Sequence, residues 1–314
     1  MHIPKATNAD QITEQLLQSL GLEISQVRAV YQEGGSPGTV LKVSVFDKGQ
    51  NEHPLILKRQ ENDAVYRLYQ QYLEPYHLNS PKEYGYIELD GQRFLVMDYI
   101  KHIRANWDDS NNYLIAVKWL IKKDLITCQN LDSVRNLDCL GKMEYYGVDY
   151  WLPEFEKWYK GSTSNHQAKV VWKRVNANQN RINEYIGELN EVGVQTVVHG
   201  DLQMSNILFG EDESNNELFV IDWTQPHISS VTKDLASLYD NAPDDVKSEL
   251  IETYRKQMDF HHFDEVFAKA KMLRDIGYLC WMVWMINEGQ KEEIAQNELD
   301  RVATSLVMSL DEGR

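Results

Sequence analysis

The sequence has few cysteines, and their placement argues against two kinds of structural cross-link. The three cysteines, Cys128, Cys139 and Cys280, lie far apart and form no C-x-x-C pair. A disulfide framework needs an even set, and a structural zinc site needs paired ligands at short spacing. Neither is expected, and this cysteine usage favours a reducing, cytoplasmic compartment.

Long apolar runs and an excess of positive charge are also missing. The longest apolar run, residues 276–286, has eleven residues, whereas a bilayer crossing needs about 20, so a buried helix is predicted there. A secretory signal has a positively charged start followed by an apolar segment, and the first ten residues do not show this pattern. With 48 acidic against 32 basic residues the formal net charge is −16, which argues against nucleic acid or an anionic membrane as partner.

What is present is typical of a globular chain of two lobes. The chain has 314 residues, of which 42% are hydrophobic and 25% charged, and this length favours roughly two domains. Strand-like segments dominate the first hundred residues, with a strong hairpin signal at Asp90-Gly91. Helical patterns dominate the remainder, near residues 110–129, 150–160, 166–192, 232–239, 244–257, 263–288 and 291–310. The predicted fold class is α+β, with an antiparallel-sheet lobe at residues 1–98 and a larger, mostly helical lobe at residues 99–314.

One stretch, residues 197–224, carries the chemistry. It sets His199, Asp201 and Asn206 in an H-G-D-x-x-x-x-N run after a strand, and Asp222 follows in an I-D-W after a second apolar segment. One Asp can accept a proton from an attacking hydroxyl, while an Asn and a second Asp can hold the magnesium that shields phosphate charge. In this order the residues predict phosphoryl transfer, whereas singly each acid would be a turn or cap residue.

Features of the first lobe fit the same chemistry. Gly34, Gly35 and Ser36 lie in a glycine-rich loop between strands, where backbone N–H groups can approach phosphate; a plain turn is the alternative. Lys58 ends an apolar strand and can add a charge to the same cleft, unless it is simply solvated. Glu61 or Asp63 can pair with it, and Glu61 is preferred because it lies on the apolar face of the next helix.

A nucleotide base is expected at the end of the last strand of this lobe. Met97 and Tyr99 lie where the strand leads into the helical lobe, and the exposed backbone there can bond to the base. This expectation rests on position alone.

These motifs resemble the catalytic core of the aminoglycoside phosphotransferase and choline kinase superfamily, which has the protein-kinase-like fold. The resemblance covers most of the chain, including GGSPGTVLKV, ILK, HGDLQMSN, VIDW and KDLASLY. It implies ATP and magnesium as cofactors, Asp201 as catalytic base, Asn206 and Asp222 as metal ligands and Lys58 as a phosphate contact. His199 would be structural, and Asp234 resembles the acid that braces the catalytic loop.

Two departures from related kinases bear on the acceptor. Gln203 stands where many antibiotic kinases have His and protein kinases have Lys. The segment between Asp222 and Asp234 is too short for a protein-kinase activation segment, and no A-P-E follows. A small molecule is therefore favoured over a protein as acceptor.

The helical lobe is rich in tryptophan, and aromatic faces near acids can hold an organic cation. Glu154 and Glu288 are among those acids, with Asp108 and Asp109. The alternative, favoured by their helical spacing, is that Trp281 and Trp284 are core residues. The tryptophans concerned are Trp107, Trp119, Trp151, Trp158, Trp172, Trp281 and Trp284.

The sequence thus predicts a phosphotransferase that moves the γ-phosphoryl of ATP to a hydroxyl of a small molecule. Aminoglycoside-like antibiotics, choline-like amines and sugars are the candidate acceptors, with a cationic one suited to the acidic chain. A non-catalytic scaffold on the same fold, similar to the spore-coat kinase-like proteins of the superfamily, is the alternative. The choice between ATP and GTP, the acceptor and the oligomeric state stay open.

Overall fold

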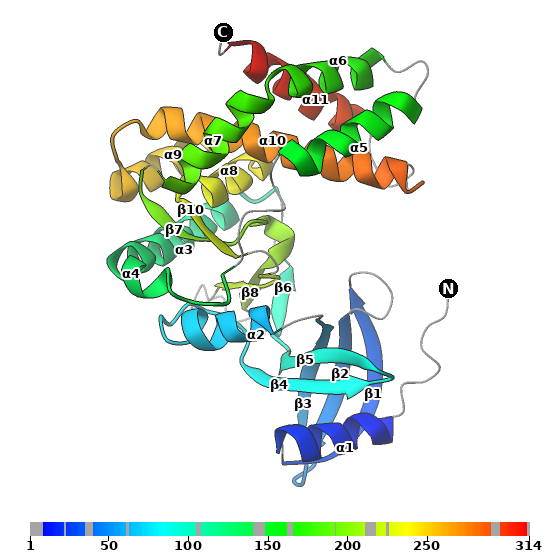
Figure 1. Cartoon of the computed structure of the whole chain (residues 1–314). Helices are drawn as coiled ribbons and strands as arrows, with labels where there is room; N and C mark the ends of the chain where they lie inside the picture. Colours follow the sequence, from blue (N-terminus) through cyan, green and yellow to red (C-terminus); the bar gives the residue numbers. More distant parts are fainter. Residues whose placement is uncertain are drawn as a thin grey trace. The chain divides into compact units, whose positions relative to one another are not determined.

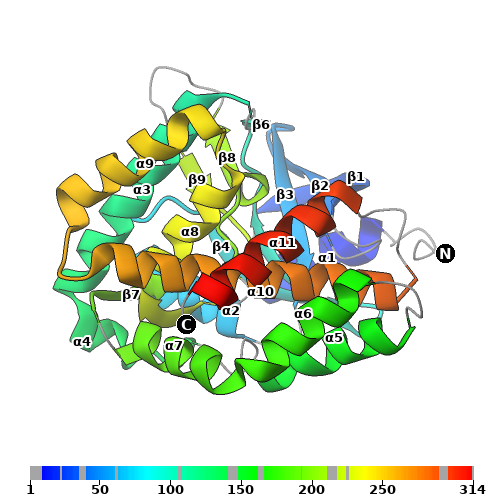
Figure 2. The same cartoon turned by 90° about the horizontal axis from the view of Figure 1, so that it is seen from above.

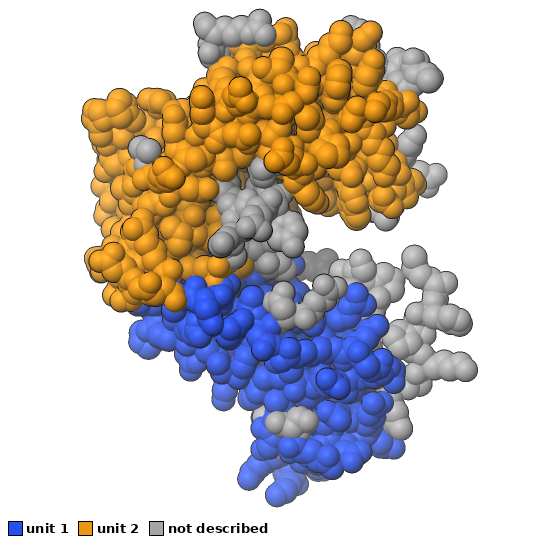
Figure 3. All heavy atoms as spheres, viewed as in Figure 1, with its two compact units in different colours: residues 1–105, 137–139, 205–223 blue, residues 106–136, 140–204, 224–314 orange. Residues whose placement is uncertain are grey.

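The computed structural model describes most of the chain and divides it into two compact units (Figure 3). The described residues are 9–21, 23–34, 40–60, 63–104, 108–140, 148–161, 166–191, 193–210, 218–223, 226–289 and 296–312. Unit 1 comprises residues 1–105, 137–139 and 205–223, and unit 2 comprises residues 106–136, 140–204 and 224–314. The domain boundary predicted between residues 98 and 99 stays a prediction.

Unit 1 is built on a five-stranded antiparallel sheet with the strand order β1-β2-β3-β5-β4 (Figure 1). Asp90 and Gly91, with φ of 50° and 72°, turn β4 into β5, because a two-residue hairpin turn of matching twist needs left-handed backbone. The predicted antiparallel sheet and hairpin are confirmed. The strands are β1 (Ile24–Gly34), β2 (Val40–Asp47), β3 (Glu52–Arg59), β4 (Glu83–Leu89) and β5 (Gln92–Asp98).

Helix α1 (Ala9–Leu20) lies across one face of this sheet (Figure 1). Its Ile12 and Leu16 are fully buried in a cluster with the inward side chains of the strands. Gly85 on β4 has a φ of 121°, and a Cβ there would lie 2.8 Å from Leu20 Cδ2. Glycine is favoured there chiefly by the positive φ, because the atom that a Cβ would meet is the end of a flexible leucine side chain.

The remainder of unit 1 contains a short helix and a second, small sheet. The helix predicted to follow Lys58 is described from residue 64 on, as α2 (Ala64–Leu68) followed by a π-helical turn, η1 (Tyr69–Leu73). The second sheet has the order β6-β8-β9 and consists of β6 (His102–Arg104), β8 (Ile207–Gly210) and β9 (Leu218–Val220). Strand β9 corresponds to the second apolar segment, which precedes Asp222 in the sequence. A 3-10 turn, η3 (Met204–Asn206), precedes β8.

Unit 2 is mostly helical, as predicted, and its described residues include one two-stranded sheet. The sheet pairs β7 (Gln195–Val198) with β10 (His227–Ser230), antiparallel, with His227 opposite Val198. The single helix predicted at 166–192 is two helices, because the chain turns at Asn178 after α6. The helices are α3 (Ser110–Gln129), α4 (Leu131–Val134), α5 (Val148–Gly161), α6 (His166–Ala177), α7 (Gln179–Glu191), α8 (Thr232–Asn241), α9 (Asp244–Met258), α10 (Phe263–Asn287) and α11 (Gln296–Glu312).

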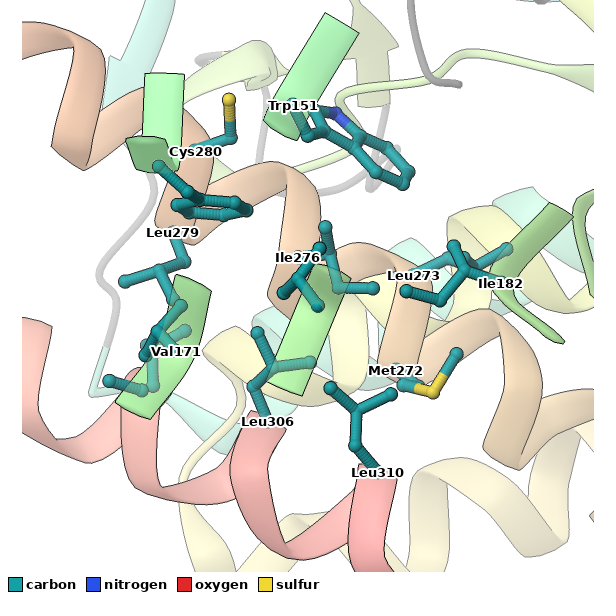
Figure 4. Packing of buried hydrophobic residues seen from close by; sticks show 14 of the residues in the cluster. Trp151, Val171, Ile182, Met272, Leu273, Ile276, Leu279, Cys280, Leu306 and Leu310 are labelled. Atoms are coloured by element: carbon teal, nitrogen blue, oxygen red, sulfur yellow. The ribbon is translucent and has the colours of Figure 1, made fainter. Parts of the chain in front are cut away.

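The core of unit 2 forms around α10. This helix packs against α5, α7, α8 and α11, and α11 crosses over it in Figure 2. Trp151, Ile276 and Leu306 interlock from three different helices and are at most 2% exposed (Figure 4). None of the described helices has the length and apolar content that a membrane crossing needs.

Candidate functional site

The HGD segment forms a loop that leaves β7 in unit 2. His199 is buried, and its Nδ1 accepts a hydrogen bond from the backbone N–H of Asp201 at 3.2 Å. Gly200 has a φ of 88°, a left-handed conformation that favours glycine. Asp201 is exposed, and its Oδ2 accepts a hydrogen bond from Gln203 Nε2 at 3.0 Å. The loop therefore presents an oriented carboxylate to solvent.

Asp234 fixes the start of this loop from the first turn of α8. Its carboxylate accepts the backbone N–H groups of His199 at 2.9 Å and Gly200 at 3.2 Å. It also accepts Lys123 Nζ at 2.8 Å, and both side chains are at most 1% exposed. Burial alone would raise the pKa of Asp234, but Lys123, His199 and the backbone N–H outweigh it and hold this pKa below its ordinary value.

A buried ionic network extends from Lys123 beneath the loop. Lys123 also donates to the backbone O of Val197 at 2.6 Å and lies 3.0 Å from Asp124 Oδ1. Asp124 accepts the hydroxyls of Thr196 at 2.8 Å and Tyr254 at 2.6 Å. Burial raises the pKa of Asp124 in spite of these partners. The network joins α3, β7, α8 and α9, so it ties the loop to the body of unit 2.

The sequence reasoning missed Lys123 and Asp124. The signal that could have found them is their position in α3, three and four residues after the buried Leu120, on the stripe that continues to the buried Thr127. A charged pair on the apolar stripe of a helix requires partners within the fold, because unpaired buried charges are costly.

In unit 1, Lys58 on β3 meets Asp222. Lys58 Nζ lies 2.5 Å from Asp222 Oδ1, and the side chains are 19% and 42% exposed. Asp222 has a φ of 67°, a left-handed conformation that is uncommon for residues other than glycine but that Asp adopts more readily than most. Two residues 164 positions apart, both singled out from the sequence, are thus in direct contact.

Asn206 and the I-D-W segment are joined through their backbones. The carbonyl of Asn206, a residue 8% exposed, accepts the backbone N–H of Ile221 at 2.9 Å. Trp223 is buried, and its Nε1 donates to the carbonyl of Val220 at 3.1 Å. Its ring packs edge-on against Tyr72, with centroids 6.3 Å apart. The Trp of the motif is therefore an anchor that fixes the backbone beside Asp222.

The sequence analysis offers Glu61 or Asp63 as the acid that pairs with Lys58. Glu61 lies outside the described residues. Asp63, the alternative partner, forms an ion pair with Arg93 on β5 instead. Among the described residues, Asp222 forms an ion pair with Lys58.

The glycine-rich loop and the strand expected to contact the nucleotide base are only partly described. Gly34 ends β1 opposite Val40, while Gly35 and Ser36 lie outside the described residues. Met97 is buried within the sheet, and Tyr99 follows the end of β5. The backbone N–H of Asp98 donates to the carbonyl of Lys82 and that of Tyr99 to Pro54. These two N–H groups are therefore used within the fold.

The tryptophans of unit 2 divide into core and surface. Trp119, Trp151 and Trp158 are buried, and Trp107 lies outside the described residues. Trp172 is half-buried and stacks on Tyr159.

The expectation that Trp281 and Trp284 are core residues is wrong. They are 49% and 42% exposed, although the run around them is buried as predicted. The reason is helical geometry: the core takes the face of α10 with Ile276, Leu279 and Val283, so residues 281 and 284 fall on the opposite side.

The side-chain oxygens of Asn206 and Asp222 are of the type that Mg²⁺ prefers. An amide and a carboxylate suffice, because protein-bound Mg²⁺ keeps several waters and takes further oxygens from substrate phosphates. Among the described residues there is no group of three or more His, Cys, Asp or Glu side chains arranged to hold a metal, so a closed all-protein metal cage is not indicated in that part of the chain.

Comparisons with known proteins give one partial family match and several whole-chain structural matches. Residues 145–262 match the model of the ecdysteroid kinase-like family. A spectinomycin phosphotransferase crystallised with ADP and spectinomycin shares 14% identity over 98% of each chain, with a TM-score of 0.54. A wild-type aminoglycoside 2'-phosphotransferase in its GDP complex shares 13% over 98% of this chain and 100% of its own, with a TM-score of 0.58.

A choline/ethanolamine kinase family protein from Mesorhizobium loti is similar too. It shares 12% identity over 96% of this chain and 94% of its own, with a TM-score of 0.58. The comparison with curated proteins found no match. At such identities the likeness establishes the fold. The resemblance predicted from the motifs is thereby confirmed: the chain has the protein-kinase-like fold of the aminoglycoside phosphotransferase and choline kinase superfamily.

Proposed function

We propose that the protein is a small-molecule kinase that transfers the γ-phosphoryl group of ATP to a hydroxyl. The observation that carries this proposal is the contact of Lys58 Nζ with Asp222 Oδ1 at 2.5 Å, since both residues are expected to act on one ligand, the magnesium-bound triphosphate. Structural relatives crystallised with ADP and with GDP support a nucleotide ligand. The three cysteines are free thiols, in keeping with the cytoplasmic location that we propose.

For the donor, we assign the phosphates to Lys58 and the magnesium to Asn206 and Asp222. Bound Mg²⁺ would neutralise charge on the β- and γ-phosphates, which is most of what phosphoryl transfer requires. We further propose that Gly34, Gly35 and Ser36 contact the phosphates, that Glu61 orients Lys58 once nucleotide is bound, and that Met97 and Tyr99 contact the base.

For the acceptor, we assign proton removal to Asp201. The acceptor oxygen attacks the γ-phosphorus, its proton passes to the Asp201 carboxylate, and the bond to the β-phosphate oxygen breaks, releasing ADP. Asp234 keeps the loop in place through the backbone of His199 and Gly200. Gln203 is neutral, so its contact with Asp201 Oδ2 orients the base without a second charge.

The exposed face of α10 favours an organic cation as acceptor. Tyr278 stacks on Trp281 with an interplanar angle of 8°, and Trp284 and Glu288 continue the same exposed stripe. The C-terminal end of α10 adds the negative end of a helix dipole. Aromatic faces beside a carboxylate and a helix C-terminus attract ammonium groups, and relatives act on or bind spectinomycin, kanamycin and ethanolamine.

A second acceptor class is an apolar polycyclic alcohol. The match of residues 145–262 to the ecdysteroid kinase-like family favours it, and the same tryptophans would then bind by stacking without a charge. Binding of the two acceptor classes should respond differently to salt, because salt screens the attraction of a cation but not the stacking of an uncharged ring system. ATP consumption measured across amines, aminoglycosides, sugars and sterols at low and high salt separates them.

The kinase is distinguished from a non-catalytic scaffold by nucleotide binding and turnover. ATP with magnesium at 100 times its dissociation constant should stabilise the protein by about 2.7 kcal/mol. Asp201→Asn should keep that thermal shift but lose roughly 10²–10⁴ in turnover, the share of a general base. Absence of any shift with ATP and magnesium would support the scaffold, and full turnover in Asp201→Asn would refute the assignment of the base.

A further inference from the structure

One lysine lies fully buried beneath the HGD loop, and the phosphotransfer proposed above does not use it. Lys123, in the second half of α3, is 0% exposed. Its Nζ has three acceptors within 3.0 Å, namely the carbonyl of Val197 at 2.6 Å, Asp234 Oδ2 at 2.8 Å and Asp124 Oδ1 at 3.0 Å. A lysine ammonium has three N–H donors, so the fold supplies acceptors for this charge from β7, α8 and α3 itself.

The ammonium of Lys123 acts on the HGD loop in two ways. It donates directly to Val197, which lies in β7 two positions before His199. It also donates to Asp234 Oδ2, and the same oxygen accepts the backbone N–H of His199 at 2.9 Å. The Nδ1 of His199 in turn accepts the backbone N–H of Asp201 at 3.2 Å. A continuous line of hydrogen bonds therefore joins Lys123 to the backbone of the proposed base.

Stability alone gives little reason for a charge at this position. Burial of an ammonium is unfavourable, and replacing a buried ion pair by apolar side chains of similar volume is often neutral or stabilising. A methionine would fill much of the space that the aliphatic stem of Lys123 occupies. What it could not supply is orientation, because a buried network with all its hydrogen bonds made rigidifies the groups that it joins.

The charge of Lys123 also keeps Asp234 in the form that holds the loop. Against burial, which would raise the pKa of Asp234, the charge of Lys123 is the largest cause that lowers it. An ionised carboxylate accepts hydrogen bonds with both oxygens, whereas a protonated one donates from one of them. Both oxygens of Asp234 are needed, since Oδ2 accepts the N–H of His199 and Oδ1 that of Gly200.

We propose that Lys123 is a positioning residue for phosphoryl transfer, which fixes the HGD loop so that the Asp201 carboxylate keeps its direction toward the acceptor hydroxyl. This inference rests on the proposed function, in which Asp201 is the base. Lys123 touches no substrate and acts through Val197 and Asp234. Because α3 packs against β7, α8 and α9, the ammonium is itself held by the body of unit 2.

The test is Lys123→Met, which removes the ammonium and keeps most of the stem. Peptides that cover residues 197–204 should exchange amide hydrogen at least about tenfold faster, and kcat should fall roughly 10- to 100-fold, because a small displacement of a catalytic group is costly. The KM for ATP and the magnesium-dependent affinity for ATP should stay unchanged, since Lys58 and Asp222 belong to unit 1. Turnover is expressed per bound nucleotide, counted by calorimetry, so that an unfolded fraction does not lower kcat.

Two further variants complete the test. Lys118→Met is the matched control, because it makes the same substitution in the same helix at an exposed position, and it should leave loop exchange and kcat unchanged. If Lys123→Met fails to fold, the double variant Lys123→Met/Asp124→Asn replaces it. That variant removes one positive and one negative charge, so the net charge of the buried cluster is conserved while Val197 and Asp234 still lose the ammonium. It should show the same faster loop exchange and lower kcat.

The proposal is overturned if a folded Lys123 variant keeps the loop exchange and kcat of the natural protein, or if its kcat and its ATP affinity fall together. In the natural protein the amides of His199 and Gly200 should exchange as slowly as those of β7. Exchange at the rate of an exposed loop would overturn the proposal even if neither variant folds. A natural protein without turnover on any acceptor would refute the proposed function instead, and loop exchange would still report whether Lys123 holds the loop.

Discussion

Replacing Asp234 by Asn probes how the HGD loop is held. The amide has the shape of the carboxylate but no charge, and only its oxygen accepts hydrogen bonds. Asp234 accepts three donors, from Lys123, His199 and Gly200. At least one donor in the variant must face the NH₂ group, so either a loop N–H loses its partner or Lys123 does.

The magnitude follows from those contacts. Removing one member of a buried ion pair costs 3–5 kcal/mol when the other charge is left uncompensated. Lys123 keeps Asp124 at 3.0 Å and the carbonyl of Val197 at 2.6 Å, which places the expected loss at the lower end, about 3 kcal/mol in unit 2. Asp244→Asn is the matched control, because Asp244 has an ion pair with Lys247 but its side chain is 96% exposed.

The assay is urea unfolding at several pH values, followed by hydrogen exchange of peptides from β7 and α8 so that unit 2 is read directly. The pKa of Asp234 is lowered in the folded protein, so its charge contributes stability above its ordinary pKa of 3.8, which is lost as pH falls through the lower, folded-state pKa. The difference between the two proteins should therefore be constant from pH 5 to 8 and shrink below about pH 4.

Two results would refute this reasoning. A loss below about 1 kcal/mol at pH 7 would mean that Asp234 does not carry the network. A difference in unfolding free energy that grows as the pH falls would contradict a lowered pKa of Asp234 in the folded protein. Asp244→Asn should leave the unfolding midpoint unchanged at every pH tested.

Further predictions follow from single residues. Gly200→Ala should destabilise unit 2 by about 1–2 kcal/mol, because Gly200 has a φ of 88°; urea unfolding measures it, and Gly187→Ala in α7, with no positive φ, is the control. Burial, with Glu74 and Asp98, raises the pKa of Glu83 from 4.5 to about 8, so stability present below pH 4.5 is lost as pH rises through 8. Glu83→Gln should then be more stable than the natural protein at pH 9, by roughly 1–2 kcal/mol after solvent screening, and equal to it near pH 4. Trp284→Ala should raise the acceptor KM about tenfold and leave the ATP KM unchanged, whereas Trp284→Phe keeps a ring face and most of the affinity; equal effects on both KM values would contradict an acceptor role. Asp222→Ala should remove the magnesium-dependent thermal shift with ATP; an unaltered shift would refute its metal role.

The sequence predicted those parts of the fold whose signals are local. Asp90-Gly91 predicts a hairpin because both residues readily adopt the left-handed backbone that a two-residue hairpin turn requires. The HGD and I-D-W runs indicate their strands because short apolar segments flank the polar residues. The contact between Lys58 and Asp222 was not predicted as such, since the sequence offered Glu61 or Asp63 as partners of the lysine; a pairing over 164 positions leaves no local trace.

The features that the sequence did not predict depend on contacts between segments that are distant in the chain. The residues of β10 show no strand alternation, and the strand exists because β7, about thirty positions earlier, pairs with it. Helix α10 is apolar over nearly its whole circumference in its second half, so periodicity could not tell that Trp281 and Trp284 face outward. Lys123 lies on the apolar stripe of α3, but its partners Val197 and Asp234 belong to other elements, so the sequence could not name them.

The contact of Lys58 with Asp222 also has an energetic meaning for the proposed function. Its side chains are 19% and 42% exposed, and ion pairs this accessible contribute only about 0–1 kcal/mol. A triphosphate offers Lys58 several negative oxygens, and a divalent cation offers Asp222 twice the charge of an ammonium, so both residues gain stronger partners when nucleotide binds. The pair therefore holds the two side chains in place before binding without competing against the ligand. On this reasoning Lys58→Met should weaken nucleotide binding through lost phosphate contacts while Asp222 still binds magnesium, and isothermal titration with magnesium and ATP separates the two effects.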